Sequence, residues 1–529
     1  MNTPPPRGFA AQPGLAAAWP ARTRTIAAAL LGLALLAFLA SNPWFAVLDD
    51  ETTIAVAAAQ PVSQTLSLFL AGAGQHWHPP LSDLLLHGWL LLGGGESLTT
   101  LRLPSVLLYL AGLAVLAQAA NHLAGPRAVL PVLVLGVFSP SAFHFARLAG
   151  WYAWCFFLVA ALSLAYIRWL QQASAARATV FALLGLALVA SNYLGWALLA
   201  LLLFDAWRHG APARTARRQV LALAALFAVA ALPLLPSALG LIEPGSAWPR
   251  WTLGAGLNAV YNLFVLFASE AVAPWYWRWS LPVGVAVAAS LALAWRHAPP
   301  LARRLALDAA VLFLLLAVLG ALNTKRLLIL MPWVVLSLGT ALVCAPPRQR
   351  QGLALALLVI GALGWLGTLT RAHYAAMHFV EPWRELAAQT APAVRAGAVV
   401  LTNSRPFSFE LHHALMQDDP SSPAPRMPGY AQGERVRSYF ETPIGSLDFL
   451  RGAPDVRHVV GVQHRMDDDQ RVTAWLDAHC LRRGGARLVE DGGHALKQRW
   501  FPGYGQRRWR VELTRHDCSQ ASQTDAGVR

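Results

Sequence analysis

Five ionisable side chains cluster in one short stretch near the N-terminus. The acids Asp49, Asp50 and Glu51 follow directly on an apolar run, and the histidines His76 and His78 precede the next one. A carboxylate can take a proton from a hydroxyl nucleophile. An imidazolium can hold a phosphate through charge-assisted hydrogen bonds. The stretch therefore has the residue types for a site that handles both a proton and a phosphate.

Four more polar residues stand near the ends of apolar segments: Arg147, Tyr152, Glu270 and Arg326. A guanidinium group binds phosphate bidentately, so Arg147 and Arg326 are further candidates for a phosphate site. A plainer reading stays open, in which the acids of the N-terminal stretch only end a helix and its histidines occupy a turn. A divalent metal held by the two histidines and an acid is another alternative, although we expect no metal.

The composition determines what kind of protein carries these residues. The chain has 529 residues, of which 56% are hydrophobic and 13% are charged. Its apolar runs have the length that crosses a bilayer core of roughly 30 Å. The net charge of +15 comes largely from arginines in short loops and in the C-terminal part. This pattern encodes membrane topology and excludes a nucleic-acid-binding protein. We therefore expect a helical membrane protein with many spans.

The arginines also predict which loops face the cytoplasm. Arg7, Arg22 and Arg24 stand before or at the start of a first span at about 24–45, so residues 1–23 should be a cytoplasmic segment, with a cleaved signal peptide as the alternative. The apolar run 81–95 is too short to span and should be re-entrant or interfacial. If 81–95 does not cross the membrane, the basic loops that follow it all face the cytoplasm. This register predicts about eleven spans within a transmembrane domain at 24–371, in the plasma membrane of a bacterium.

Two large outer loops and a soluble tail complete the predicted architecture. The loops are 47–101 and 240–278, and the second is rich in Trp, which indicates a membrane-interface belt or a surface for stacking sugars. Residues 372–529 alternate helix and strand patterns, so we expect an extracytoplasmic (periplasmic) α/β domain. If this tail faces an oxidising compartment, its cysteines Cys480 and Cys518 form a plausible disulfide pair.

Several short motifs resemble those of a known family. The acids after the first span, the HPPL sequence at 78–81, the LRLPS sequence at 101–105 and the ARLAGWYAW block at 146–154 look like the GT-C membrane glycosyltransferases. These include the protein O-mannosyltransferases and the lipid A aminoarabinose transferases. KRLLILMP at 325–332 is a weaker match. The clear resemblance covers residues 24–170. The sequence departs from the family pattern in three ways: Gly150 replaces an Arg, Leu327 replaces a Tyr, and the prolines after Arg326 are displaced.

The resemblance implies a sugar donor linked to a polyprenyl phosphate, and an acceptor that is a protein, a lipid or a polysaccharide. It implies that Asp50, next to Glu51, activates the acceptor hydroxyl, and that the donor phosphate lies near Arg326. His78 stands where relatives often have His or Lys. A transporter or flippase for a lipid-linked glycan is the alternative, and it predicts ionisable residues at mid-membrane, which the spans lack. A third reading is a non-catalytic envelope assembly factor.

Overall fold

A computed structural model describes most of the chain, and the statements below concern these residues: 18–42, 45, 47, 49–70, 78–95, 97–209, 214–235, 253–272, 277–319, 322–370, 383–417, 435–439, 446–461, 466–490 and 510–520. The chain forms two compact units. The first comprises residues 1–41, 61–86 and 102–373, and the second comprises 42–60, 87–101 and 374–529. The predicted boundary at residue 371 therefore describes only part of the division, because two N-terminal segments group with the tail.

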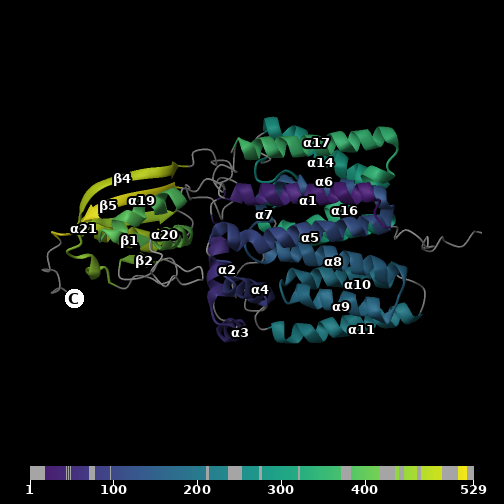
Figure 1. Cartoon of the computed structure of the whole chain (residues 1–529), viewed down its shortest axis with the longest axis horizontal. Coiled ribbons are helices and arrows are strands. Elements are labelled where there is room, and N and C mark those ends of the chain that lie inside the picture. Colours follow the sequence, from purple (N-terminus) through teal and green to yellow (C-terminus); the bar gives the residue numbers. More distant parts are fainter. Residues whose placement is uncertain are drawn as a thin grey trace, which may run out of the picture. The chain divides into compact units, whose positions relative to one another are not determined.

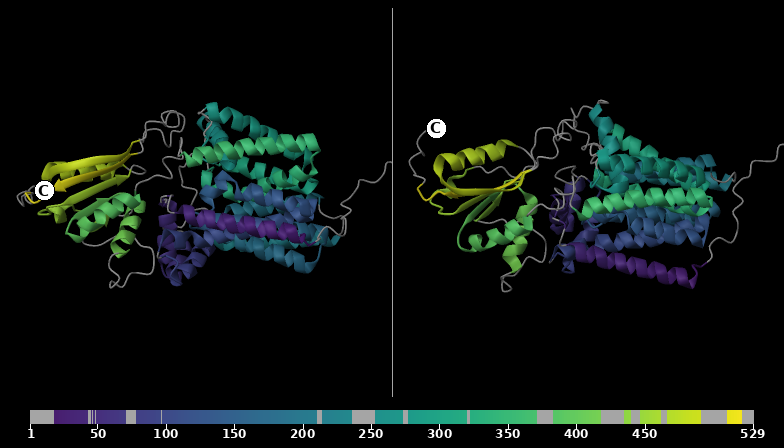
Figure 2. Two further views of the ribbon diagram at one scale, coloured as in Figure 1. Left: turned by 45° about the horizontal axis from the view of Figure 1, so that its top comes forward. Right: turned by 90° about the horizontal axis from the view of Figure 1, so that it is seen from above.

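The first unit is a bundle of helices that lie side by side (Figure 1, Figure 2). Helices α4 (Leu81–Leu91) and α5 (Leu98–Ala124) cross the boundary between the units. The remaining helices of this unit are α1 (Ala21–Ser41), α3 (Val62–Leu70), η2 (Pro126–Ala128), α6 (Val129–Val137), α7 (Pro140–Phe145), α8 (Trp151–Gln171), α9 (Ala175–Val189), α10 (Leu194–His209), α11 (Arg214–Ala231), η3 (Leu232–Leu234), α13 (Leu253–Ala268), α14 (Trp277–His297), α15 (Pro300–Val318), η4 (Thr324–Ile329), α16 (Met331–Cys344) and α17 (Pro347–Leu369).

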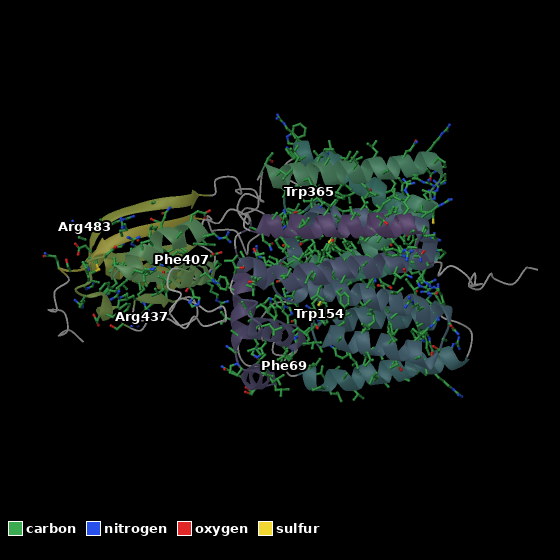
Figure 3. All side chains as sticks on the ribbon, in the orientation of Figure 1. Phe69, Trp154, Trp365, Phe407, Arg437 and Arg483 are labelled. Carbon is green, nitrogen blue, oxygen red and sulfur yellow. A yellow bond between two sulfur atoms is a disulfide. The ribbon has the colours of Figure 1, made fainter. Side chains whose placement is uncertain are left out.

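The bundle is that of a multi-pass membrane protein. Among the described residues, six helices are long and apolar enough to cross a bilayer, and five more apolar helices are shorter. The number of spans, about eleven, stays a prediction. Figure 3 shows nitrogen-bearing side chains gathered at the end of the bundle where α1 begins. That arrangement agrees with arginines concentrated at one membrane face.

The second predicted outer loop, 240–278, contains a helix where we expected loop. Helix α13 packs against α7, α14 and α17. Two glycines of α17 make this close approach possible. A Cβ atom at Gly364 would lie 2.9 Å from the Ala268 carbonyl oxygen, and one at Gly367 would lie 2.8 Å from the Ala271 Cβ. Most residues of the helix are apolar, and the surrounding Trp, Pro and Gly residues concealed it in the sequence.

The second unit contains a five-stranded sheet with the order β2-β1-β3-β5-β4. Strands β2, β1 and β3 are parallel, and β5 pairs antiparallel with both β3 and β4. The expected α/β tail is thus present. Its elements, together with the N-terminal helix of this unit, are α2 (Asp49–Ala59), α19 (Trp383–Arg395), β1 (Val399–Thr402), α20 (Arg405–Gln417), β2 (Val436–Ser438), η5 (Asp448–Leu450), β3 (Val456–Gly461), α21 (Met466–His479), β4 (Leu481–Glu490) and β5 (Arg510–Asp517).

Helices cover both faces of this sheet. On one face α19 and α20 pack on it, and Phe407 of α20, which is labelled in Figure 3, lies in the same core as Val400 and Val459. On the other face α21 packs through Leu476 against a core that includes Leu401. Val400 and Leu401 belong to the cores on opposite faces because successive side chains of a strand point to opposite faces of the sheet.

The two tail cysteines are bridged. The disulfide joins Cys480, after the last residue of α21, to Cys518, after the last residue of β5. The pairing expected from the sequence is confirmed, and it closes a loop across the antiparallel end of the sheet.

Candidate functional site

The acids of the N-terminal stretch begin helix α2 in the second unit. Acidic residues in the first turn of a helix are favourable because they face the positive end of its dipole. Asp49 and Asp50 lie in the helix, but their side chains are outside the described part of the structure. The side chains of Glu51 and Thr52 are fully buried. The candidate base Asp50 lies in the second unit, whereas the candidate phosphate-binding residues described next lie in the first unit.

His78 lies in the first unit, immediately before α4. The Leu81 amide donates to the Ala190 carbonyl oxygen at 3.0 Å and thereby fixes this segment on the turn that precedes α10. The amide nitrogen of Asn192 lies 3.5 Å from His78 Nδ1. The Leu194 amide donates to Asn192 Oδ1 at 2.9 Å, which orients the Asn192 side chain with its NH2 group toward the imidazole.

This orientation has a consequence for the imidazole of His78. If Nδ1 accepts from Asn192, then Nε2 carries the ring proton and acts as a hydrogen-bond donor. A neutral His78 can therefore donate to a phosphate oxygen, and a protonated one adds a charge. Asn192 was not identified from the sequence, since a single Asn between two apolar helices carries no recognisable signal.

A pair of buried aromatic rings lies next to His78 at the start of α8. The Trp151 ring is 4.6 Å from the His78 ring and 4.2 Å from the Tyr152 ring, measured between centroids. Gly150 precedes this pair with a φ of 138°, a conformation that side chains rarely adopt. The Gly that departs from the family pattern is therefore required by the backbone here, and it sets the direction in which Trp151 and Tyr152 leave the chain.

Arg326 lies in the short helix η4, which packs against α8 and α13. Asn323 caps η4 by accepting from the Lys325 amide at 3.2 Å. The next residues, Leu327 and Leu328, are each 1% exposed and anchor the helix in the core. The Arg326 side chain is half-buried. Leu327, one of the positions that depart from the expected motif, is a core residue of the bundle.

Arg147 has different surroundings from the other candidates. Its guanidinium is fully buried, donates from Nε to the Phe143 carbonyl oxygen at 2.9 Å and from Nη1 to Ser41 Oγ at 3.1 Å. It also lies over the rings of Phe143 and Phe38, at 4.3 and 5.3 Å from their centroids. These contacts fasten the end of α1 to the α7–α8 turn. The structure thus gives Arg147 a packing role that the sequence did not indicate.

Glu270 is buried beside a polar contact between two helices. Ser269, which follows α13, has a φ of 65° and its hydroxyl bonds to Nδ1 of the buried His144 in α7. This contact connects α7 to the end of α13, next to the close approach of α17. Neither His144 nor Ser269 was singled out from the sequence.

A metal centre was one alternative for the N-terminal stretch. Within the described ranges, no three His, Cys, Asp or Glu side chains group closely enough to hold an ion. His76, which that alternative requires, falls outside the described residues.

The first unit brings His78, Asn192 and the Trp151–Tyr152 pair together, with η4 packed on the same helix, α8. Comparison with solved structures finds the same arrangement of elements over nearly the whole chain. ArnT from Cupriavidus metallidurans bound to undecaprenyl phosphate matches with a TM-score of 0.50 and 14% identity over 96% of this chain and 100% of that chain. The apo state of the same protein matches with a TM-score of 0.52 and 14% identity over 95% and 100%.

The chain has the GT-C fold. The arabinofuranosyltransferase AftD from Mycobacteria also matches, with a TM-score of 0.45 and 19% identity over 94% of this chain and 40% of that chain. Comparison with protein-family models and with curated protein sequences gave no match. The GT-C fold that the sequence motifs implied is thereby confirmed.

Proposed function

We propose that this GT-C protein is an inverting glycosyltransferase that takes a sugar from a polyprenyl-phosphate donor and transfers it to an acceptor hydroxyl at the outer face of the membrane. The acceptor is a protein, a lipid or a polysaccharide of the cell envelope. The fold supports this proposal, since one solved structure with the same fold holds undecaprenyl phosphate. Because the identity is 14%, that likeness supports the fold, and the function rests on the residues of this chain.

In the proposed reaction the acceptor oxygen attacks the anomeric carbon as the bond from that carbon to the phosphate oxygen breaks. Asp50 takes the proton of the acceptor hydroxyl, and the polyprenyl phosphate leaves with its added negative charge. His78 and Arg326 hold the phosphate and offset the charge that builds on it. Attack opposite to the leaving group inverts the configuration of the sugar.

The observation that carries the proposal is the grouping around the start of α8. His78 lies beside the Trp151–Tyr152 pair, its Nδ1 faces the Asn192 amide nitrogen, and η4 packs on the same helix with Arg326 half-buried. An imidazole and a guanidinium on segments that pack against the same helix are groups that can hold the phosphate of such a donor.

Envelope glycans and lipids from a strain that lacks this chain should reveal the product. Mass spectrometry should detect the loss of one sugar modification, and expression of the wild-type chain should restore it. The Asp50→Asn variant keeps the side-chain size but removes the proton acceptor, so transfer should fall by about 10²–10⁴-fold while donor binding changes little.

Asp49→Asn is the matched control, because it alters the neighbouring acid and should have a much smaller effect. Near wild-type transfer by Asp50→Asn would move the role of base to Glu51. An unchanged set of glycans and lipids in the strain without the chain would overturn the proposed function.

A further inference from the structure

Arg405 occupies a costly position in the second unit. It is the first residue of α20 and is 5% exposed. A cation in the first turn faces the positive end of the helix dipole, and a buried guanidinium costs free energy unless it is hydrogen-bonded. The helix has its own cap, since Ser404 Oγ accepts from the Phe407 amide at 3.2 Å. Arg405 is therefore not needed to start α20, and its burial calls for another contact.

That contact is with helix α2. Arg405 Nη1 bonds to the Thr53 hydroxyl, two residues after Glu51, and α2 packs against α20. The buried positions of α2 (Glu51, Thr52, Ala55 and Ala58) lie on one helical face. At the other end of α2, His87 Nδ1 lies 2.7 Å from the Ala58 carbonyl oxygen.

Helix α2 needs such contacts to keep its shape. It has 11 residues, and isolated helices shorter than about 12–15 residues are marginal in water. Its orientation therefore depends on side chains from elsewhere in the second unit. Only a fixed α2 can hold an acid at a constant position relative to a bound acceptor.

The topology of the sheet explains why Arg405, three residues after the end of β1, can contact Thr53. Strand β1 lies between β2 and β3 in the parallel part of the sheet, and the chain leaves β1 toward β2 but leaves β3 toward the opposite edge. The carboxyl ends of two strands with diverging connections form the crevice in which α/β domains place their ligands. Here Asn403 Oδ1 accepts from the Gly461 amide at 2.7 Å across this point, and Arg405 follows two residues later.

We propose that Arg405 is a positioning residue. It holds α2, through Thr53, so that the acids at the start of α2 meet the acceptor in one orientation. The tail domain then has a part in the reaction, because the first residue of its helix α20 fixes the helix that carries the proposed base. This inference rests on the proposed function, in which Asp50 of α2 is the base.

The test uses the purified full-length chain and two readouts. One readout is hydrogen exchange of the α2 amides, and the other is transfer from a polyprenyl-phosphate sugar. We expect Thr53→Val and Arg405→Ala each to increase exchange over residues 49–59 and to lower kcat by about 10- to 100-fold, because displacement of a catalytic group by about 1 Å can cost 10²-fold. The KM for the donor should stay within about twofold, since the phosphate-binding residues are unaltered.

Three variants serve as controls. Thr53→Ser keeps the hydroxyl and Arg405→Lys keeps a cationic donor, so both should recover part of the activity. Thr390→Val makes the same change in α19, where the hydroxyl bonds only to the Leu386 carbonyl of its own helix at 2.7 Å, and should leave α2 and kcat unchanged. Unaltered exchange in β1 and β3 shows that each variant is folded.

The two readouts separate two kinds of failure. Unchanged exchange of α2 in both Thr53→Val and Arg405→Ala would overturn the positioning role, whatever the activity. Faster exchange with an unchanged kcat would also overturn it, because a loosened α2 would then not matter for transfer. If the wild-type chain transfers no sugar, the proposed function fails, and hydrogen exchange alone still shows whether Arg405 holds α2.

Discussion

At the scale of single residues, the proposed phosphate contact of His78 and Arg326 can be tested by substitution. A lost hydrogen bond to a charged group costs about 1.5–3 kcal/mol, so His78→Ala and Arg326→Ala should each lower kcat/KM by about 10- to 150-fold. Arg326→Lys should recover only part of the loss, because an ammonium group cannot make the bidentate contact. The measurement is steady-state transfer from a polyprenyl-phosphate sugar.

The double variant His78→Ala/Arg326→Ala decides whether the two residues share one phosphate. Groups that hold the same ligand should show non-additive effects. Asn192→Ala is a useful companion, because it removes the amide that faces His78 Nδ1 and should weaken transfer less than His78→Ala does. Strictly additive losses with unchanged donor affinity would place His78 and Arg326 in separate sites.

The sequence predicted the types of these residues better than their surroundings. It predicted His78 as a phosphate contact, but the approach of Asn192 and Trp151 to it depends on contacts between segments more than 70 residues apart. The phosphate role of Arg147 stays a prediction, and the hydrogen bond of its guanidinium to Ser41 was not foreseen. Such contacts are properties of the folded bundle and leave no trace in local spacing.

At the scale of elements, strand β3 contains a histidine that should make the tail sensitive to acid. His458 is 2% exposed and its Nε2 lies 2.7 Å from the Tyr439 hydroxyl oxygen. Burial, with a smaller effect of the nearby His516, lowers the pKa of His458 to about 3. The folded tail therefore binds fewer protons than the unfolded tail between pH 6.5 and 3, so acid favours unfolding.

The stability of the tail should be complete above about pH 6.5 and should fall by up to about 1.4 kcal/mol per pH unit below it. The urea midpoint for proteolysis of the tail in the full-length chain measures this loss. His458→Gln keeps a hydrogen-bonding side chain without the titration and should flatten the dependence. An equal slope in wild type and His458→Gln would assign the effect to other groups, such as His516.

Elements of the tail were predicted well wherever a local pattern was complete. The sequence patterns of the tail predict a helix at 382–395, strands at 398–401 and 458–462, and a helix from 409. The first three agree with α19, β1 and β3 to within two residues at either end. Helix α20 begins four residues earlier than the expected 409, because Ser404 caps it there. The three-residue strand β2 was missed, since it is shorter than any periodic signal and forms by pairing with β1.

At the scale of the whole molecule, the sequence predicted a membrane domain followed by a tail, and the chain is divided differently. Residues 42–60 and 87–101 belong to the same compact unit as the tail. Sequence order could not reveal this grouping, because it depends on contacts such as that between Thr53 and Arg405. The acids and the tail thus form one unit, which the positioning role of Arg405 requires.

The direction of the chain through the membrane is the last prediction, and α4 decides it. Helix α4 has 11 residues, a length of about 16 Å, which is half of the bilayer core. We therefore expect α4 to enter and leave at the outer face, so that Leu92, Gln64 and Ser446 are outside and Ala175 is inside. All four side chains are exposed, so single cysteines at these positions should react with a membrane-impermeant maleimide from the stated side.

The native Cys344 is exposed and provides an internal control, because the same register places it inside. It should react only after the membrane is opened, and the other cysteine variants are made with Cys344 replaced by Ser. Labelling of Leu92→Cys from the cytoplasmic side would mean that α4 crosses the bilayer. Every later loop would then change sides, the arginine-rich loops would face outward against the usual bias, and Arg326 would leave the face on which His78 meets the donor phosphate.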